Sequence, residues 1–392
     1  MHRPLSDFGV TPGGDPVKNA ARLQEGIDWA SPRGGALYVE PTDEPYRIAG
    51  GVILRQNVSL IGVHGPVGRG TRHPDRAQPV GSVFAIEDET SPFLTVEHAT
   101  QVRGIQFWYP RQTADDASRI IPYPATIRVS PDTGAQGVTL SCLTFFGEYL
   151  AMDFAASPKC ICEQILFEHC YGYPLGGTFI RIDYCYDIPR ILHCHVNPAN
   201  RRFIDGGHGK AVIDATMARK TFCYSIDHTD NAQLMDLFTF GTWGGIHLGP
   251  ATYGQLTNFN LDCVAVGILK QGDQNFNRNW QIAQGSIIAN GGAPLEDIHP
   301  LIVEGQGHTA LANVESFSGH NGALTTLGQS QDFLLLRGNE RLTVSMFGCR
   351  MRNYAAAEPV TVQNPKAVVQ AVACVDHHEN PWPAKPFCAR GE

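Results

Sequence analysis

Two acidic side chains near the middle of the chain have the chemistry of an acid–base pair. Asp183 and Asp187 lie four residues apart in the segment RIDYCYDIPR, and His193 and His195 follow them. Cleavage of a glycosidic bond requires two carboxyl groups, one to protonate the leaving oxygen and one to act as base or nucleophile. Asp183 and Asp187 are therefore the leading candidates for this chemistry, with Asp205 in reserve. The alternative is that these acids cap turns by accepting bonds from backbone N–H groups.

Side chains suited to binding a sugar gather mainly around two long insertions, residues 108–135 and 197–230. Long loops within a compact fold are usually functional. Aromatic rings can stack on the apolar faces of sugar rings, whereas Arg and His can bind hydroxyl groups. The candidates for substrate binding are Trp108, Tyr109, Arg190, His195, His208 and Trp243. The alternative is that the loops only cover the core or form a contact between subunits.

The histidines next to the acids alternate with a cysteine, so neighbouring side chains face opposite sides of a strand. Two phasings are possible. In the first, Cys194 faces the core, while His193 stacks over His169 and His195 over Tyr171 on the outside. In the second, the cysteine faces outward and the histidines are buried and hydrogen-bonded. We favour the first, which would place an exposed ladder suited to proton transfer beside the acids.

The first 62 residues predict one helix followed by short strands. Residues 16–30 begin with a proline and place apolar residues along one helical stripe. The members of the stripe are Val17, Ala20, Leu23, Ile27 and Ala30. The segments ALYVEP and YRI each predict a short strand, and GVILRQNVSLIGV predicts two.

Beyond about residue 80, short apolar runs recur between residues typical of turns, with a regular period. Residues 231–248 align with residues 253–270 at an offset of 22, which pairs Leu234 with Leu256 and Ile246 with Ile268. A coil of roughly this length, made of short strands and turns, is the unit of a parallel β-helix, in which stacked coils share one core. The alternative fold is an all-β sandwich.

The composition excludes several classes of protein. The chain has 392 residues, of which 17% are charged and 43% are hydrophobic, so it is not a disordered chain. No apolar run is long enough to predict a membrane span. A net charge of −8 without a Lys/Arg block argues against nucleic acid or a membrane as partner. The eleven cysteines lie mostly in apolar runs, where thiols fill core space, and no metal site is expected.

The beginning of the chain resembles a known group of proteins. The segments DFGV, RGGALYVEP, YRIAGGVIL and NVSLIG are similar to the amino-terminal cap and first coil of the pectate lyase superfamily. This is the glycoside hydrolase family 28-related group of right-handed parallel β-helix proteins, which includes tailspike-like proteins. The likeness is specific over residues 7–62 and generic to about residue 375. The acidic motif DG-x-T-DD, which is common after DFG in this group, is replaced here by GGDPVKNAA. This difference affects only the cap of the helix.

The resemblance implies a single-stranded right-handed parallel β-helix with an amino-terminal helical cap. We expect one structural domain, with the cap helix and first coil in residues 1–62 and the β-helix with its long loops in residues 63–392. It also implies a carbohydrate partner and a homo-oligomer, with a trimer favoured. The segment MHRPLSDFGV has no apolar signal region. The many cysteines favour a cytoplasmic protein over one whose secretion signal was removed.

The motifs of family 28 test the assignment further. Those enzymes resemble one another in four motifs, in the order N-T-D, D-D, G-H-G and R-I-K. Residues 207–209 match the third, but no N-T-D precedes them, and adjacent acids occur only at Asp115 and Asp116. The nearest match to the last motif, at residues 181–183, lies upstream and ends in Asp183. The sequence therefore does not support a polygalacturonase.

The expected function is cleavage of glycosidic bonds in a polysaccharide or oligosaccharide, without a cofactor. One alternative is a polysaccharide lyase, which would need cations such as Arg201, Arg202 and Lys210, together with Ca²⁺. An epimerase or an intramolecular glycosyl (fructo)transferase on the same fold is a related alternative. A non-catalytic tailspike-like module that binds glycan, or a purely structural one, is the alternative from another class.

Overall fold

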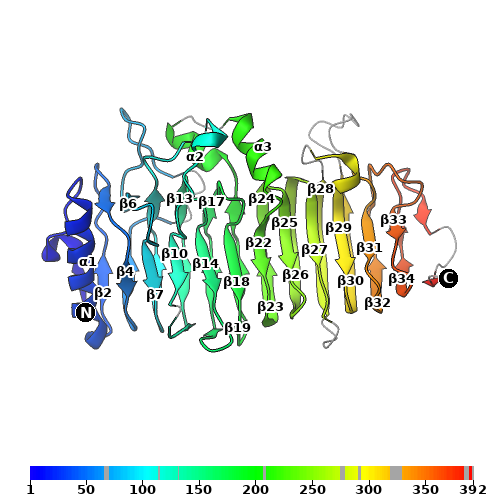
Figure 1. The fold of residues 1–392 in the computed structure, drawn as a ribbon, viewed down its shortest axis with the longest axis horizontal. Helices are drawn as coiled ribbons and strands as arrows, with labels where there is room; N and C mark the ends of the chain where they lie inside the picture. The colour runs from blue at the N-terminus through cyan, green and yellow to red at the C-terminus, as the bar shows by residue number, and fades with distance from the viewer. Residues whose placement is uncertain are drawn as a thin grey trace. The chain divides into compact units, whose positions relative to one another are not determined.

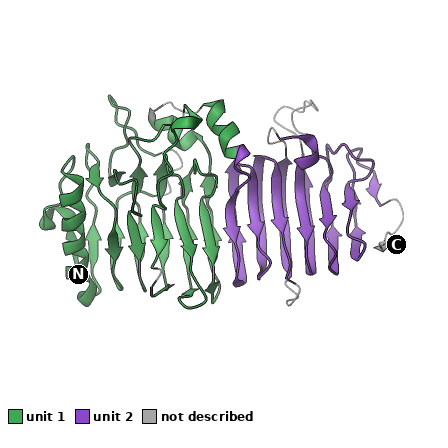
Figure 2. Ribbon diagram, viewed as in Figure 1, with its two compact units in different colours: residues 1–216 green, residues 217–392 purple. Residues whose placement is uncertain are grey.

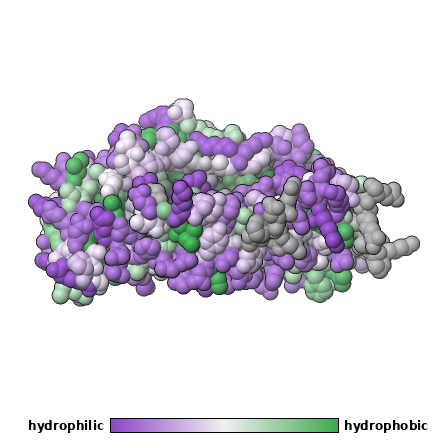
Figure 3. Space-filling model, turned by 60° about the horizontal axis from the view of Figure 1, so that its bottom comes forward, coloured by the Kyte–Doolittle hydropathy of each residue, from purple (hydrophilic) through white to green (hydrophobic). Residues whose placement is uncertain are grey.

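The computed structural model describes residues 1–65, 70–113, 115–130, 132–205, 209–273, 279–289, 293–317, 329–383 and 388–390. The chain divides into two compact units, unit 1 at residues 1–216 and unit 2 at residues 217–392 (Figure 2). Figure 3 shows one face of the molecule, on which hydrophilic side chains dominate and hydrophobic ones form small separate patches. Among the described residues, no helix is both long and apolar enough to cross a membrane.

The amino terminus of unit 1 is a helical cap. Helix α1 spans Pro16–Ala30 and begins after Asp15, whose carboxylate accepts a bond of 2.8 Å from the N–H of Lys18. The predicted helix is confirmed, and it begins and ends at the predicted residues. Leu23, Ile27 and Ala30 are buried, but Val17 is 68% exposed, so the buried stripe starts after the first turn. The helix packs against β3 and β4 at the end of unit 1 where the chain begins (Figure 1).

The strands predicted after the helix are also present. The segments ALYVEP, YRI and GVILRQNVSLIGV contain β2 (Ala36–Tyr38), β3 (Tyr46–Ile48), β4 (Val52–Leu54) and β5 (Ser59–Ile61). In β2 the middle side chain is buried, whereas in β3 and β4 the first and last side chains are buried. This alternation is expected of strands with one face on a core. Glycines and polar residues separate them, which keeps each strand short.

Successive coils of unit 1 stack their strands in parallel ladders. The first ladder is β2, β5, β8 (Gln101–Arg103), β12 (Thr139–Ser141), β16 (Leu166–Glu168) and β20 (Arg190–Leu192). The second is β3, β6 (Val83–Ile86), β9 (Gln106–Trp108), β13 (Thr144–Phe146), β17 (Tyr171–Gly172) and β21 (His195–Val196). The third is β4, β7 (Leu94–Val96), β10 (Ile127–Val129), β14 (Met152–Ala155) and β18 (Ile180–Asp183). A short ladder joins β11 (Ala135–Gln136), β15 (Cys162–Glu163) and β19 (Cys185–Tyr186).

Unit 2 continues the same plan with longer strands. One ladder contains β23 (Thr229–Met235) and β24 (Phe238–Phe240), both paired with β26 (Thr252–Val264), then β28 (Trp280–Ala289), β30 (Gly307–Ser316), β32 (Leu342–Phe347) and β34 (Ala367–Val372). The other contains β22 (Phe222–Ile226), β25 (Gly244–Leu248), β27 (Val266–Lys270), β29 (His299–Glu304), β31 (Leu334–Arg337) and β33 (Val360–Val362). Near the end of the chain, β35 (Cys374–Val375) and β36 (Pro381–Trp382) pair antiparallel, and β37 (Cys388–Arg390) pairs antiparallel with β34.

The predicted repeat is confirmed by the strand register. Leu234 pairs with Leu256, and Ile246 pairs with Ile268, which is the offset read from the sequence. All of these side chains are at most 2% exposed, so each coil presents the same apolar positions to its neighbour. Parallel stacking of this kind rules out the sandwich, because a sandwich is built from antiparallel strands.

The core is filled by stacked aromatic and aliphatic rows, with thiols among them. In unit 1, the rings of Phe84, Phe107 and Phe145 follow one another at centroid distances of 6.5 and 5.0 Å. Burial of each such side chain contributes about 1.5 to 3 kcal/mol. Eight of the ten cysteines whose burial is described are buried, as expected of thiols that fill core space.

The second predicted long loop is not entirely irregular. It contains two short helices, α2 (Ala199–Asp205) and α3 (Lys210–Ala218). Helix α2 packs against β13 and β17. Among its described residues between β9 and β10, the first insertion contains one 3₁₀ turn, at Ala117–Arg119.

Candidate functional site

A cavity of about 540 Å³ lies in unit 2, along the ladder that runs from β22 to β33. Its floor is apolar and includes Val266, Leu269, Ile302 and Leu335 from three neighbouring strands. Polar and charged side chains surround this floor, among them Glu296, Asp297, His299, Gln331, Asp332, Arg337 and Gln363. Such a mixture of apolar surface and a few convergent polar groups is typical of a ligand site.

The most deeply buried charged group in the cavity wall is Asp332. It precedes β31 and is 0% exposed, and its Oδ1 lies 2.7 Å from Nδ1 of His299. The second oxygen, Oδ2, is buried, and no described residue donates a hydrogen bond to it. A buried carboxylate oxygen without a partner is costly. Because Asp332 is 0% exposed, a ligand in the cavity reaches this oxygen only if the wall opens.

His299 is held from both sides by hydrogen-bond acceptors. Its Nε2 lies 3.0 Å from the backbone carbonyl of Glu296, in addition to the contact between Nδ1 and Asp332. A carbonyl accepts only, so Nε2 must carry a proton. The contact to Asp332 then contains one further proton, shared between imidazole and carboxyl. Both imidazole nitrogens therefore have hydrogen-bond partners in the wall of the cavity.

An aromatic side chain and a cation form another part of the site. Trp243 lines the cavity, and its carbonyl accepts bonds of 2.8 and 3.0 Å from the N–H groups of Ala265 and Val266. Nζ of Lys220 lies 4.8 Å from the centroid of the Trp243 ring. The same ammonium group is 3.3 Å from Asp297. The contacts fix the indole beside the acidic rim.

A line of hydrogen-bonded polar side chains ends at Arg337, which lines the cavity. Nε2 of His247 contacts Oε1 of Gln271 at 2.8 Å, and Nε2 of Gln271 donates to Glu304 at 2.6 Å. Glu304 also accepts from Nε of Arg337, which is its partner in the register of β29 and β31. The positive charge of Arg337 is thus compensated by a carboxylate on the neighbouring strand.

The acids predicted from the sequence lie in unit 1, in different ladders. Asp183 ends β18 and pairs in register with Ala155. Asp187 follows β19 at a left-handed bend (φ 52°), is exposed and accepts from the side chain of Gln164. Arg190 opens β20, and its guanidinium donates to the carbonyl of Ile188 at 3.2 Å. Asp205 ends α2, whereas His208 lies outside the described residues.

The first of the two histidine phasings is confirmed. The rings of His169 and His193 stack at 4.8 Å with 15° between their planes, and Tyr171 pairs with His195. Cys194 is 1% exposed and faces the core. Both His169 (φ 50°) and His193 (φ 55°) occupy left-handed bends that turn the chain from the first ladder into the second. The structure therefore places this ladder of rings on the outside of unit 1.

The aromatic residues predicted to bind substrate have different surroundings. Trp108 ends β9 and is half-buried. Tyr109 is only 1% exposed, and its hydroxyl group lies 2.6 Å from Oγ1 of Thr126. Burial raises the pKa of Tyr109 well above its usual value. Tyr109 is therefore a core residue and does not fit the predicted stacking role, whereas Trp243 does line a cavity.

Arg201 has a structural position rather than an exposed one. It belongs to α2, is 3% exposed, and donates from Nη1 to the carbonyls of Tyr109 and Phe146 at 3.1 Å each. It also donates from Nη2 to the carbonyl of Gln112. The two predicted long loops are therefore joined through this guanidinium, which does not lie free at a surface as a lyase cation would.

Sequence reasoning did not identify His299 and Asp332. They are 33 residues apart, and the segments EDIHP and SQDFLLLR carry no motif that links them. The only signal is that Asp332 directly precedes the apolar run of β31. The length of the intervening coil departs from the 22-residue offset, so the pairing follows only from the strand register.

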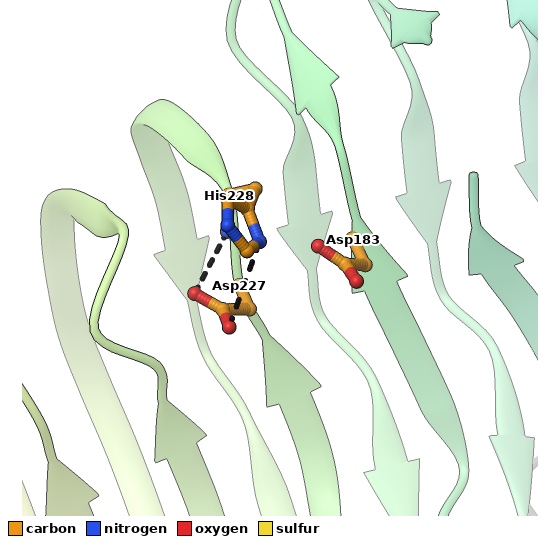
Figure 4. A group of neighbouring side chains, drawn as sticks. All are labelled: Asp183, Asp227 and His228. Atoms are coloured by element: carbon orange, nitrogen blue, oxygen red, sulfur yellow. Dashed lines mark hydrogen bonds and ion pairs between the residues drawn. The ribbon is translucent and has the colours of Figure 1, made fainter. Parts of the chain in front are cut away.

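A second acid–histidine contact follows β22 in unit 2 (Figure 4). The backbone N–H of His228 donates to Oδ1 of Asp227 at 2.9 Å, and Nδ1 of His228 lies 3.7 Å from Oδ2 of the same residue. Asp227 also accepts from the N–H of Ala251 at 3.0 Å, so it caps the turn between β22 and the next coil. Asp183, drawn in the same figure, belongs to unit 1.

Comparison with known proteins identifies the fold. No family model and no curated protein matches the chain. Among solved structures, the exopolygalacturonase of Thermotoga maritima is similar with a TM-score of 0.55 at 10% identity, over 100% of this chain and 94% of that one. A double mutant of the tailspike protein of E. coli bacteriophage HK620 has a TM-score of 0.58 at 11% identity, over 96% of this chain and 66% of that one.

A third similar structure is DFA-IIIase from Arthrobacter chlorophenolicus A6 without its lid. Its TM-score is 0.53 at 10% identity, over 96% of this chain and 94% of that one. Identities this low show the fold alone. The chain thus has a right-handed parallel β-helix fold with an amino-terminal helical cap.

Proposed function

We propose that this protein cleaves glycosidic bonds in a polysaccharide or oligosaccharide, with the cavity of unit 2 as its substrate site. The observation that carries the proposal is the pairing of Asp332 with His299, because both residues line the same cavity as Trp243. The fold supports it as well, since similar structures include an exopolygalacturonase and a tailspike protein in complex with a pentasaccharide.

The chemistry follows from the two kinds of carboxyl group in the wall. In this proposal Asp332 acts as the base, held by His299 at its Oδ1; since Asp332 is 0% exposed, the wall must open for Oδ2 to take a proton from an attacking water. The second carboxyl comes from Glu296 or Asp297, which form the rim of the cavity. The apolar floor and Trp243 exclude water and contact the faces of the sugar ring.

The acids predicted from the sequence form a second candidate set. Asp183 and Asp187, with Asp205 in reserve, would act in unit 1 together with Trp108, Arg190, His195 and His208. The half-buried ladder of His169, His193, Tyr171 and His195 favours this set, because imidazole and phenol groups can hydrogen-bond the hydroxyl groups of a sugar. We rank it second because Asp183 and Asp187 lie in different ladders.

The decisive experiment measures the release of reducing ends from a glycan panel by the wild type, by Asp332→Asn and by Asp187→Asn. We expect the first variant to lose activity by about a hundredfold or more, as is usual when a general base is removed, and the second to retain it. The reverse pattern would move the site to unit 1. If both variants keep full activity, hydrolysis through these carboxyls is excluded.

The other candidate reactions give distinct products. A lyase would release an unsaturated uronate that absorbs in the ultraviolet, and a transferase or epimerase would change the glycan without new reducing ends. A glycan-binding module would bind the panel and release nothing. The expected homo-oligomer, with a trimer favoured, is part of the same proposal and would bring several cavities onto one particle.

A further inference from the structure

A serine in unit 2 contacts a histidine whose other ring nitrogen is held by a glutamine. Oγ of Ser225 lies 3.2 Å from Nδ1 of His247, its partner in the register of β22 and β25. We propose that Ser225 is an activated nucleophile, with His247 as its base, and that it hydrolyses carboxylic esters with a small apolar acyl group. This activity goes beyond the proposed cleavage of glycosidic bonds, because it uses other residues and breaks another bond.

The hydrogen bonds beyond the histidine fix which of its nitrogens carries the proton. Nε2 of Gln271 donates to Oε1 of Glu304 at 2.6 Å, since a carboxylate can only accept. The carbonyl oxygen of Gln271 therefore faces Nε2 of His247, at 2.8 Å, and it too can only accept. Neutral His247 must then carry its proton on Nε2. Nδ1 is left as the acceptor for the hydroxyl proton of Ser225.

The arrangement contains the three parts of an activated nucleophile. A hydroxyl group within hydrogen-bond reach of a base, with the base oriented by a third group, is the pattern that nucleophilic catalysis requires. Glu304 also accepts from Arg337 on the neighbouring strand, which holds its carboxylate in place. Ser225, His247 and Gln271 are all half-buried, so a substrate can reach the hydroxyl group without any opening of the core.

Apolar side chains beside the imidazole indicate the kind of acyl group. The ring centroids of Phe222 and His247 are 5.5 Å apart, with 36° between the planes. Leu269 is the partner of His247 in the register of β25 and β27. Both Phe222 and Leu269 also line the cavity of unit 2. An apolar acyl group next to the base would therefore bury its surface against them.

The reaction consists of two balanced steps. Oγ of Ser225 attacks the carbonyl carbon of the ester while its proton passes to Nδ1 of His247. The bond from that carbon to the alcohol oxygen breaks, and Nδ1 returns the proton to the leaving oxygen. Water, which gives a proton to the same nitrogen, then cleaves the acyl-serine, releases the carboxylic acid and restores the hydroxyl group. Nε2 keeps its proton throughout, bonded to Gln271.

The test uses the full chain with two probes. A fluorophosphonate labels activated serines covalently, and 4-nitrophenyl acetate reports turnover. We expect mass spectrometry of peptides from the labelled wild type to find the adduct on Ser225. Ser225→Ala should lower kcat/KM for the ester by about a hundredfold or more, and His247→Gln should do the same, because each removes one half of the proton transfer.

A second serine–histidine contact in unit 2 provides the matched control. Oγ of Ser345 lies 3.0 Å from Nε2 of His308, and both side chains are half-buried. In the part of the chain that the structure describes, no group bonds to Nδ1 of His308, so nothing there fixes the position of its proton. Ser345 should therefore remain unlabelled, and Ser345→Ala should hydrolyse the ester as the wild type does.

Gln271 acts through the histidine and is a positioning residue. Gln271→Leu should lower kcat about tenfold with KM nearly unchanged, a split that a loss of folded protein or of ester binding would not produce. A loss in KM alone would contradict this role. Equal labelling of Ser225 and Ser345 would contradict it too, because only one of the two histidines is oriented.

The remaining outcomes separate this inference from the proposed glycosidic cleavage. Absence of an adduct on Ser225 in the labelled wild type overturns the inference, whether or not Ser225→Ala folds. Ester hydrolysis without release of reducing ends from any glycan supports the inference and contradicts the proposed cleavage. Release of reducing ends by a protein that neither takes up the label nor hydrolyses the ester has the opposite meaning.

Discussion

At the scale of single residues, His299 and Asp332 show how a buried acid–histidine pair can be accommodated in a β-helix. The imidazole is bonded to the carboxyl of Asp332 and to the carbonyl of Glu296, so all of its polar atoms have partners. Within the described part of the chain, Oδ2 of Asp332 has no such partner. Removal of one member of such a pair strongly destabilises the folded protein, since the other member remains buried without its partner.

Removal of His299 alone should therefore destabilise the protein more than removal of both partners. We expect His299→Leu to lower the free energy of unfolding by about 3 to 5 kcal/mol. The double variant with Asp332→Leu should recover much of this loss, because no buried charge remains. Urea unfolding of His299→Leu, Asp332→Leu and the double variant measures the coupling free energy between the two side chains. Additive effects in this cycle would contradict a direct interaction between the two side chains.

At the scale of elements, the cap helix depends on a single acidic residue. The acidic box that related caps carry is missing from this sequence, yet Asp15 accepts from the N–H of Lys18 and begins α1. The first turn of a helix has N–H groups without intrahelical partners, so a carboxylate in this place satisfies one of them and interacts favourably with the helix dipole. One side chain thus replaces the cluster.

The variant Asp15→Ala should cost about 1 kcal/mol of stability through the loss of this cap. Val17→Ala is a suitable control, since Val17 is 68% exposed in the same turn and makes no buried contact there. Chemical unfolding, monitored by circular dichroism, measures the stability of both variants. Equal stability of Asp15→Ala and the wild type would show that the cap contributes nothing.

At the scale of the whole molecule, a chain with few charges still buries a titratable group beneath its long loops. Glu148 in unit 1 is 0% exposed, and burial raises its pKa to about 8, partly offset by backbone N–H groups and by the charge of Arg201. Arg201 is the residue that joins the two insertions. Glu148 is therefore protonated at neutral pH in the native state, whereas it is ionised in the unfolded chain.

Stability should consequently fall as the pH rises. The native pKa of about 8 exceeds the unfolded value of 4.5, so the unfolded state releases the proton first. The contribution of Glu148 is complete below pH 4.5 and is lost progressively up to about pH 8, on the order of several kcal/mol. Glu148→Gln should remove this dependence, and the exposed Glu25→Gln should not. Thermal midpoints between pH 5 and 8 provide the measurement, and parallel curves for all three proteins would refute the expectation.

Much of the architecture could be predicted from the sequence because it rests on local patterns. Helix α1 follows from a proline and a 3.6-residue stripe, and the repeat of Leu234 on Leu256 follows from identical apolar positions in successive coils. The histidine ladder followed from alternation along a strand. The tertiary structure alone decided that Tyr109 is buried and that Asp332 meets His299. The physical reason is that coils of unequal length stack by strand pairing, so contacts between them depend on a register that no short segment contains.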